Sequence, residues 1–505
     1  RERWDAEEAG DEEDGKGTMR PLPLMRWRQD GLALILLGGM TVISMLTTFL
    51  FGIVILRQQS ERSELQGRKI ITGINHSPDF VIKHTNSRVT SPPLLQDLPP
   101  CMNATDVTML LLISGAHVFD PQPRGRMDIL VGGGKILRLF EPGAFDPGEL
   151  EKKNLLRVVD ASGLVATPGL VDMHVHLTGG GGEAGPSSRV PQPKLSDLIQ
   201  GGLTTVVGLL GTDSISRSLE TLSMTVAGLN SLPISAFMYT GAYKTLPESP
   251  NMLGSVMKDI ALLEPVVGVK VAISDFRGSQ PTLSHMVNLA ADAKVGGMLG
   301  GKSGIMYLHI GSNVEKLDML WDIVNVTGLP KSQVVPTHVG RTPELAKASA
   351  LWLRDGGIVD VTANSKAADV VEAYINAKLP LERVCVSSDA YGSLPKFDSN
   401  KQLIGYSFAK PTRLIHFLRE MLSRGHSLAE MLPLVTFNPA ATLKLPRGKG
   451  RIVEGGDADI ALWKLSEKAI EAKETLVLKG LFSKGMTALS STCVATDMFG
   501  RIRST

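Results

Sequence analysis

The sequence predicts an α/β protein whose centre is a closed parallel (β/α)8 barrel, with a doubly wound open sheet as the alternative. Between residues 169 and 389, eight short runs rich in β-branched residues alternate with amphipathic segments. One such segment, residues 345–357, ends in two glycines, as helices often do. The chain of 505 residues has room for a barrel of about 250 residues and further domains.

The eight runs are each long enough for one buried strand and short enough to exclude long helices. Eight strands with intervening helices favour closure into a barrel over an open sheet. The predicted strands are residues 170–176, 203–210, 234–240, 268–275, 305–310, 334–339, 358–364 and 383–389.

Both flanks of the barrel alternate like antiparallel strands with glycine turns. This pattern occurs before the barrel, as in residues 110–120 and 127–140, and again after it, as in residues 450–465. We therefore expect one small β-sandwich domain built from both flanks. The expected limits are residues 108–168 and 441–505 for this domain and its C-terminal tail, and 169–440 for the catalytic barrel.

The N-terminal part predicts a membrane anchor. Residues 31–56 carry no charge, and a helix of that length would span about 39 Å, enough to cross a bilayer. It would follow an N-terminal tail, residues 1–30, and precede a proline-containing stalk, residues 57–107. Positive charges balance on the two sides, so the orientation stays open, and the body would be cytoplasmic if the mature chain lacked this segment.

Charge and cysteine content exclude several classes of protein. The 53 Lys and Arg residues nearly balance the 51 Asp and Glu residues, so nothing favours nucleic acid as a partner. The chain has only three cysteines, which rules out a disulfide scaffold.

Chemically active residues occur near the carboxyl ends of the predicted strands, where barrel enzymes carry their sites. A buried lysine such as Lys270 needs a carboxylate partner, a lowered pKa or a covalent modification. Imidazoles and carboxylates are ordinary zinc ligands, so bound metal would account for the whole set. The residues are His174 and His176 on the first strand, Lys270 on the fourth, His309 on the fifth, His338 on the sixth and Asp389 on the eighth.

Several motifs resemble a known family. Residues 168–176, PGLVDMHVH, resemble the signature of the amidohydrolase superfamily. Within it, residues 179–186 and 206–217 resemble isoaspartyl dipeptidases, also called β-aspartyl peptidases. Residues 240–243 and 336–339 extend the match, which covers roughly residues 110–490. The resemblance implies a TIM-like metal-dependent hydrolase barrel and a homo-oligomer.

The resemblance also implies a site for two divalent ions. Zinc is usual, although the same ligands suit manganese, cobalt or iron. Lys270, carbamylated by carbon dioxide, would bridge the ions. Asp389 would bind the first ion and act as general base and general acid. The implied histidine ligands are His174 and His176 for the first ion and His309 and His338 for the second.

The implied substrate is a β-aspartyl (isoaspartyl) dipeptide, which carries one free ammonium group and two carboxylates. Glu183 would bind the ammonium group, Arg277 and Arg341 the carboxylates, and Tyr243 the developing oxyanion, while Thr212 and Ser393 add polar contacts. The expected function is thus that of a metallo-dipeptidase. The alternatives are an amidohydrolase that acts on an N-acyl amino acid or a cyclic imide, and an amidohydrolase-like binding protein without catalysis.

Overall fold

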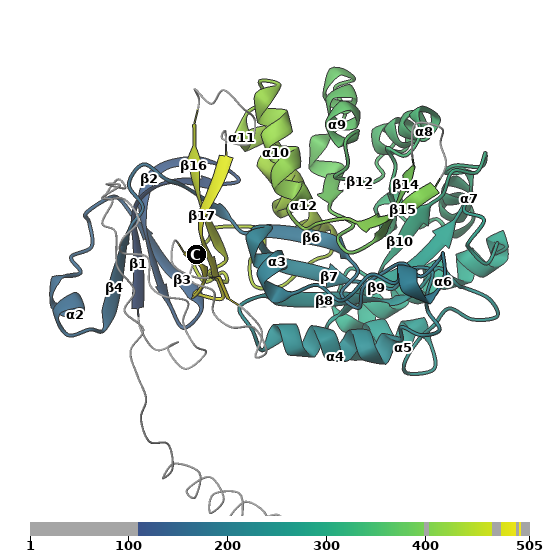
Figure 1. Ribbon diagram of the computed structural model, residues 1–505, viewed down its shortest axis with the longest axis horizontal. Helices are drawn as coiled ribbons and strands as arrows, with labels where there is room; N and C mark the ends of the chain where they lie inside the picture. The colour runs from purple at the N-terminus through teal and green to yellow at the C-terminus, as the bar shows by residue number, and fades with distance from the viewer. Residues whose placement is uncertain (1–109, 398–402, 467–475, 491–493, 496–505) are drawn as a thin grey trace, which may run out of the picture. The chain divides into compact units, whose positions relative to one another are not determined.

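The computed structural model describes residues 110–397, 403–466, 476–490 and 494–495 (Figure 1). The predicted tail and stalk lie outside these residues. The prediction of a single-pass membrane protein must be corrected, because within the described ranges no helix is long and apolar enough to cross a membrane. The apolar segment on which that prediction depended, residues 31–56, is itself not among them.

Eight parallel strands form the central sheet, and each pairs with the next along the chain (Figure 1). Nearly all of their residues are buried, which explains why their sequences are continuous apolar runs. The strands are β6 (Leu170–Val175), β7 (Leu203–Gly208), β8 (Ser235–Gly241), β9 (Val266–Ile273), β10 (Ile305–Ile310), β11 (Val334–Thr337), β12 (Val359–Thr362) and β13 (Val384–Ser387).

The sheet closes on itself just beyond its last strand. Val175 in β6 forms a parallel bridge with Ala390, and the backbone N–H of His176 donates to the carbonyl of Ala390 at 2.9 Å. The architecture is therefore a nearly closed TIM-like barrel and not the open sheet that the sequence left as an alternative.

Helices follow the strands and bury one side against the sheet. Side chains cap several of them, as when Thr342 Oγ1 accepts the backbone N–H of Leu345 at the start of α8. The helices are α3 (Leu195–Gln200), α4 (Leu219–Asn230), α5 (Val256–Leu262), α6 (Leu283–Gly300), α7 (Asp318–Thr327), α8 (Pro343–Arg354), α9 (Ala367–Asn376), α10 (Arg413–Ser423), α11 (Leu428–Met431) and α12 (Phe437–Thr442). Short 3-10 helices are η3 (Pro186–Ser188), η4 (Lys331–Gln333), η5 (Leu381–Arg383) and η6 (Leu432–Val435).

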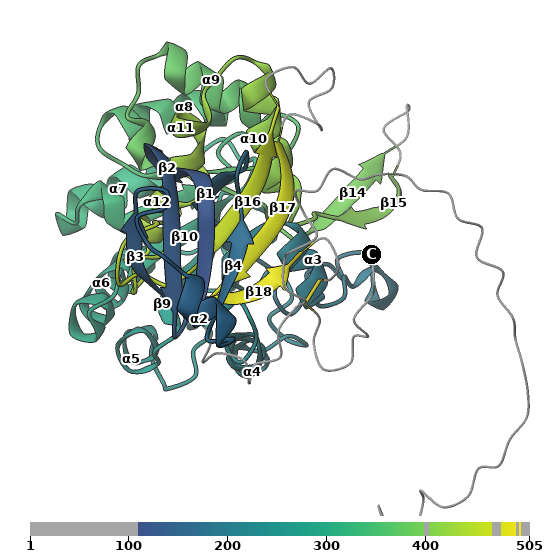
Figure 2. The same ribbon diagram turned by 90° about the vertical axis from the view of Figure 1, so that its left-hand side faces the viewer.

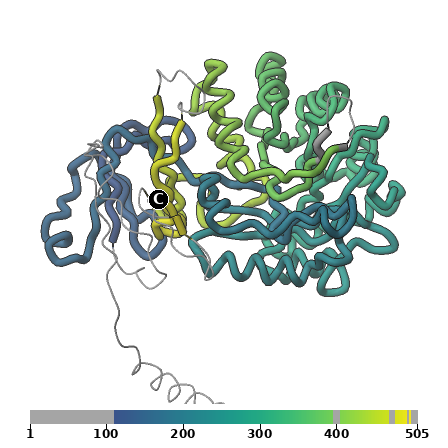
Figure 3. Tube along the Cα trace, viewed as in Figure 1, coloured from purple at the N-terminus to yellow at the C-terminus, as the bar shows by residue number. Residues whose placement is uncertain are grey.

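A second eight-stranded sheet combines strands from both sides of the barrel sequence. Figure 3 shows the C-terminal strands, in yellow, beside the barrel. The key contact is antiparallel pairing of β5 with β16, in which Pro168 lies opposite Ile460. The strands are β1 (Leu110–Asp120), β2 (Gln122–Gly132), β3 (Lys135–Phe140), β4 (Leu156–Asp160), β5 (Val165–Pro168), β16 (Ile460–Leu465), β17 (Leu476–Ser483) and β18 (Met486–Leu489), with α2 (Gly148–Lys152) between β3 and β4.

Hydrogen bonds connect these eight strands into one sheet, where the sequence predicted a β-sandwich. Strand β1 makes this possible, because it pairs with β4 over its first half and with β5 over its second half. The exact limits of the domains stay a prediction. A separate hairpin, β14 (Ser393–Phe397) and β15 (Leu403–Phe408), follows the barrel and was not predicted (Figure 2).

A buried lysine joins this sheet to the barrel. Lys449 Nζ lies 2.8 Å from Asp457 and 2.6 Å from Asp459, and it donates to Ser235 Oγ at the start of β8 at 2.7 Å. Burial disfavours the ammonium, but Asp459 and Asp457 outweigh it and raise the pKa of Lys449.

Replacing Lys449 with Met should therefore lower the free energy of unfolding by about 3 kcal/mol, because two largely buried carboxylates lose their shared cation. Urea unfolding followed by circular dichroism measures this. Lys464→Met, which changes an exposed lysine on β16, should shift the same quantity by less than about 0.5 kcal/mol. Equal shifts for both variants would contradict the prediction.

Candidate metal centre

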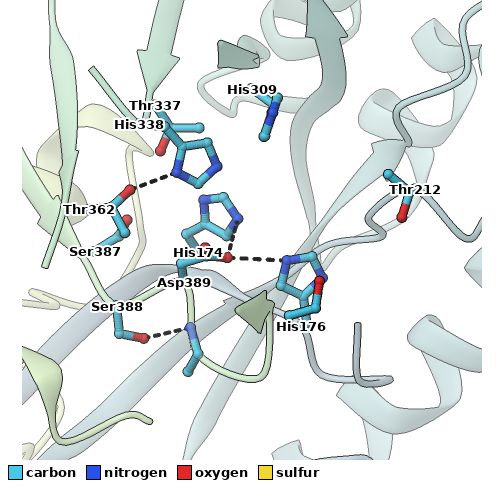
Figure 4. Close-up of polar contacts among 12 residues, drawn as sticks. His174, His176, Thr212, His309, Thr337, His338, Thr362, Ser387, Ser388 and Asp389 are labelled. Atoms are coloured by element: carbon cyan, nitrogen blue, oxygen red, sulfur yellow. Dashed lines mark hydrogen bonds and ion pairs between the residues drawn. The ribbon is translucent and has the colours of Figure 1, made fainter. Parts of the chain in front are cut away.

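Three of the predicted ligands form a compact cluster at the carboxyl end of the barrel (Figure 4). Asp389 Oδ1 lies 3.2 Å from His174 Nε2 and 3.3 Å from His176 Nε2. The three candidate ligand atoms lie within 4.8 Å of one another. Side chains two residues apart on a strand point the same way, so the His-x-His pair faces inward together. Such a His-His-Asp cluster can hold a divalent metal ion.

The backbone around Asp389 is adapted to this position. Asp389 has a left-handed conformation, with φ 53°, and precedes the residue that closes the barrel. Three residues after Asp389, a Cβ added at Gly392 would lie 2.5 Å from Asp389 Oδ1, so only glycine leaves room for the carboxylate.

The second pair of histidines lies beside this cluster but has different partners. The ring of His338 lies 5.1 Å from that of His174 and 4.5 Å from that of His309, between centroids. His338 Nδ1 contacts Thr362 Oγ1 at 2.7 Å, which leaves its Nε2 for a ligand. His309 instead contacts Asp275 through Nε2 at 2.8 Å and the hydroxyl of Tyr243 through Nδ1 at 2.5 Å. His309 must release one of these contacts to bind metal.

Lys270 points from β9 into the barrel and is fully buried. Its Nζ has no hydrogen-bond partner in the described part of the chain and lies 4.6 Å from the ring centroid of Tyr307. Burial lowers the pKa of Lys270 to about 7. The sequence left open a carboxylate partner, a lowered pKa or a covalent modification for Lys270. In the structure, the pKa of Lys270 is lowered and no carboxylate forms an ion pair with it in the described part of the chain.

Burial also keeps the histidines neutral. It lowers the pKa values of His174, His309 and His338 well below the usual range. Nearby cations act in the same direction, whereas Asp275 partly opposes the shift at His309. A neutral imidazole keeps the lone pair with which it binds metal.

The predicted substrate residues meet around Glu183, in the loop after β6. Its carboxylate accepts hydrogen bonds from Thr212 at 3.0 Å and Ser393 at 3.1 Å, and Arg277 Nη1 lies 3.6 Å away. Arg277 is itself held by Asp275 through two bonds, of 2.9 and 2.7 Å.

Glu183, Thr212, Arg277 and Ser393 line one cavity of about 70 Å³ together with His176 and Asp389 of the cluster. Tyr243 and Arg341 line the same cavity. The structure therefore brings all the predicted substrate residues next to the predicted ligands, except that the hydroxyl of Tyr243 is engaged by His309. Lys270 is not among the residues of this wall.

No protein-family model matches the chain. The crystal structure of a β-aspartyl dipeptidase from Fervidobacterium islandicum AW-1, in complex with the β-Asp-Leu dipeptide, is 39% identical with a TM-score of 0.67. The match covers 76% of this chain and 97% of that chain. The chain belongs to the β-aspartyl dipeptidase family.

A second structure agrees with this membership, and a further relative agrees with the wider amidohydrolase superfamily. A second β-aspartyl dipeptidase structure from the same bacterium is 36% identical, with a TM-score of 0.68, over 78% of this chain and 100% of that one. A dihydroorotase of Elusimicrobium minutum (strain Pei191) is 25% identical over 412 residues, which is 72% of this chain and 90% of that protein. The protein is thus a peptidase-type enzyme of the amidohydrolase superfamily, and the alternative of a binding protein without catalysis is not supported.

The structure adds buried residues that sequence reasoning missed. Asp360 Oδ2 accepts hydrogen bonds from Tyr307 at 2.7 Å, Thr337 at 2.6 Å and Ser387 at 2.6 Å. The Tyr307 hydroxyl gives its proton to Asp360, so its oxygen accepts from His174 Nδ1, which lies 3.0 Å away. This leaves the lone pair of His174 on Nε2, toward Asp389. The period of two could have revealed Tyr307, two residues before His309 on the same face.

Replacing Tyr307 with Phe should therefore weaken the binding of a divalent metal ion at this cluster about 10- to 100-fold, because the orientation of His174 is no longer fixed. Competition with a chromophoric chelator measures the zinc affinity directly. Tyr374→Phe is the matched control, since Tyr374 is also buried but its hydroxyl contacts Ser349 between helices. An unchanged zinc affinity in Tyr307→Phe would show that the bond does not position His174.

Proposed function

We propose that this enzyme hydrolyses β-aspartyl dipeptides at a site for two divalent metal ions. The observation that carries the proposal is the shared cavity, whose wall includes His176 and Asp389 of the His-His-Asp cluster as well as Glu183 and the two arginines. A β-aspartyl dipeptide keeps an α-ammonium and an α-carboxylate on its aspartyl residue and a carboxylate on the second residue. One carboxylate and two guanidinium groups complement those three charges.

The side chains present fit a pair of ions. His174, His176 and Asp389 would hold the first ion, and His309 and His338 the second. Lys270 would bridge the two as a carbamate, and its buried Nζ without a hydrogen-bond partner supports such a modification. Zinc suits this donor set. Bound ions of this kind polarise a carbonyl group and lower the pKa of a bound water, so that hydroxide is available near neutral pH.

The chain's own residues would then move the protons and hold the substrate. The carboxylate of Asp389 would accept a proton from the attacking water and pass it to the nitrogen of the leaving amine. Burial raises the pKa of Tyr243, so its hydroxyl keeps its proton and can donate to the developing oxyanion once it leaves His309. Glu183 would accept hydrogen bonds from the substrate ammonium, with Thr212 and Ser393 beside it.

The carbamate predicts how the enzyme takes up metal. Carbon dioxide reacts with the neutral amine, and burial lowers the pKa of Lys270 to about 7. At pH 8 the neutral share is roughly tenfold larger than at pH 6. Uptake of two zinc ions per chain should therefore be faster at pH 8 and faster with bicarbonate, as measured by elemental analysis. A rate of zinc uptake that depends on neither pH nor bicarbonate would exclude the carbamate.

The decisive test compares β-Asp-Leu with α-Asp-Leu, which have the same composition and charge. We expect hydrolysis of the β isomer alone, because in the α isomer the α-carbonyl forms the peptide bond and the free carboxylate of the aspartyl residue is the one on its side chain. Dihydroorotate and an N-acyl amino acid test the alternative amidohydrolase activities. Equal turnover of the two dipeptides, or none of the β isomer, would refute the proposal. A homo-oligomer stays a prediction, which size-exclusion chromatography with light scattering can test.

A further inference from the structure

A second, larger cavity adjoins the inner one. Its volume is about 440 Å³, compared with about 70 Å³ for the cavity at the metal cluster. The two cavities share Arg277, His338, Arg341, Asp389 and Ser393 in their walls. If the aspartyl part of a dipeptide fills the inner cavity, the second residue extends into the outer one. This step depends on the proposed function.

The outer cavity contains more positive charge than a simple β-aspartyl dipeptide requires. Its walls include Lys366 and Arg413 in addition to Arg277 and Arg341, whereas Asp389 is the one acidic residue of this wall in the described part of the chain. Arg277 already binds the carboxylate of Asp275. The other three cations form no ion pair with a described carboxylate.

Arg413 is one of the cations in the outer cavity that has no carboxylate partner among the described residues. It lies at the start of α10 and is half-buried. Its Nη1 has only a long contact of 3.4 Å with the backbone carbonyl of Ser388, which is a neutral acceptor. A guanidinium group is suited to a bidentate contact with a carboxylate, and none of the described residues supplies one to Arg413.

The position of Lys366 also favours a bound anion in the outer cavity. Lys366 is the N-cap residue of α9, and its side chain is exposed. The N-terminus of a helix carries partial positive charge, so a lysine there is unfavourable for the helix itself. Helix stability therefore does not explain this residue, whereas an anion in the adjoining cavity would compensate for its charge.

We propose that the outer cavity binds the side chain of the second residue and selects an acidic one. In a β-aspartyl dipeptide, Arg277 and Arg341 are assigned to the two backbone carboxylates. Lys366 and Arg413 are then left for a third carboxylate, which a C-terminal glutamate or aspartate provides. β-Asp-Glu is thus a better substrate than its uncharged analogue of the same shape, β-Asp-Gln.

The test is the ratio of kcat/KM for β-Asp-Glu to that for β-Asp-Gln, measured with the metal-loaded enzyme. We expect a ratio of about ten, because the extra charge-assisted hydrogen bonds act on binding. The difference should lie in KM, with similar kcat values, since the side chain is remote from the scissile bond. Added salt should reduce the ratio, as it screens partly exposed charges.

Variants test whether the outer cavity is responsible for the selection of an acidic second residue. Lys366→Ala should lower the ratio, because Arg413 alone remains, and Lys366→Glu should bring it to one or below, because the new carboxylate opposes Arg413. Lys347→Ala, an exposed lysine on α8 outside the cavity wall, is the matched control and should keep the ratio of the unmodified enzyme. Circular dichroism and metal content should be the same for all of these proteins.

The outcomes separate this inference from the proposed function. If β-Asp-Leu and β-Asp-Gln are hydrolysed but the Glu-to-Gln ratio is near one, the acidic subsite is refuted and the dipeptidase assignment stands. If the ratio is high but Lys366→Glu leaves it unchanged, the selection does not come from this cavity and the inference fails. If no β-aspartyl dipeptide is hydrolysed, both the dipeptidase function and the acidic subsite are refuted.

Discussion

Replacing Asp389 with asparagine is expected to lower kcat for β-Asp-Leu by roughly 10³- to 10⁴-fold. Asparagine keeps the shape of the side chain and one oxygen near His174 and His176, but it cannot accept a proton. The attacking water would then have no general base and the leaving amine no general acid. Initial rates, measured together with metal content by mass spectrometry, separate this effect from loss of metal.

Asp292→Asn serves as the control for Asp389→Asn. Asp292 lies on α6, away from both cavities, and its replacement should change kcat less than twofold. If Asp389→Asn retained the normal metal content and a rate within tenfold of the unmodified enzyme, Asp389 would not be the residue that transfers the proton.

The second large effect is expected for Lys270→Ala. If the carbamate supplies an oxygen to each ion, its loss should reduce the metal content below two ions per chain and lower kcat roughly a thousandfold or more. Elemental analysis and initial rates measure the two effects on the same sample. High concentrations of acetate should restore part of the metal binding, because a free carboxylate can supply the missing oxygens.

Lys270→Met tests whether packing explains the loss. Methionine fills much of the space beside Tyr307 but cannot form a carbamate, so it should lose metal and activity as Lys270→Ala does. Full activity in either variant would refute the bridging role. Loss of activity with two ions still bound would mean that Lys270 acts in some other way.

Much of the barrel could be predicted because its strands carry a clear physical signal. All eight strands of the sheet overlap the predicted runs, since strands covered on both faces must be apolar throughout. The positions of the candidate ligands followed from the same reasoning. His174, His176 and Asp389 lie at carboxyl ends of strands, and the closure of the barrel brings the first and last strands together.

The remaining features depend on contacts that no periodicity encodes. A pattern places His309 on the inner face of β10, but it cannot show that Asp275 and Tyr243 take both ring nitrogens. Likewise, the hydrogen bond from Tyr307 to Asp360 joins residues 53 positions apart in the sequence. The hairpin of β14 and β15 was missed because its short strands follow directly after the predicted eighth strand.

The pairing of β5 with β16 has a consequence for biosynthesis. Strand β5 passes through Gly169 into β6, which bears His174, so the first candidate histidine ligand lies close to a strand whose partner begins at Ile460. While the ribosome is still translating the barrel, the edge of β5 that pairs with β16 has no partner. The nascent chain must therefore keep an unpaired, apolar strand from associating with other chains until the last segments emerge. Dependence on a chaperone during synthesis is the expected result.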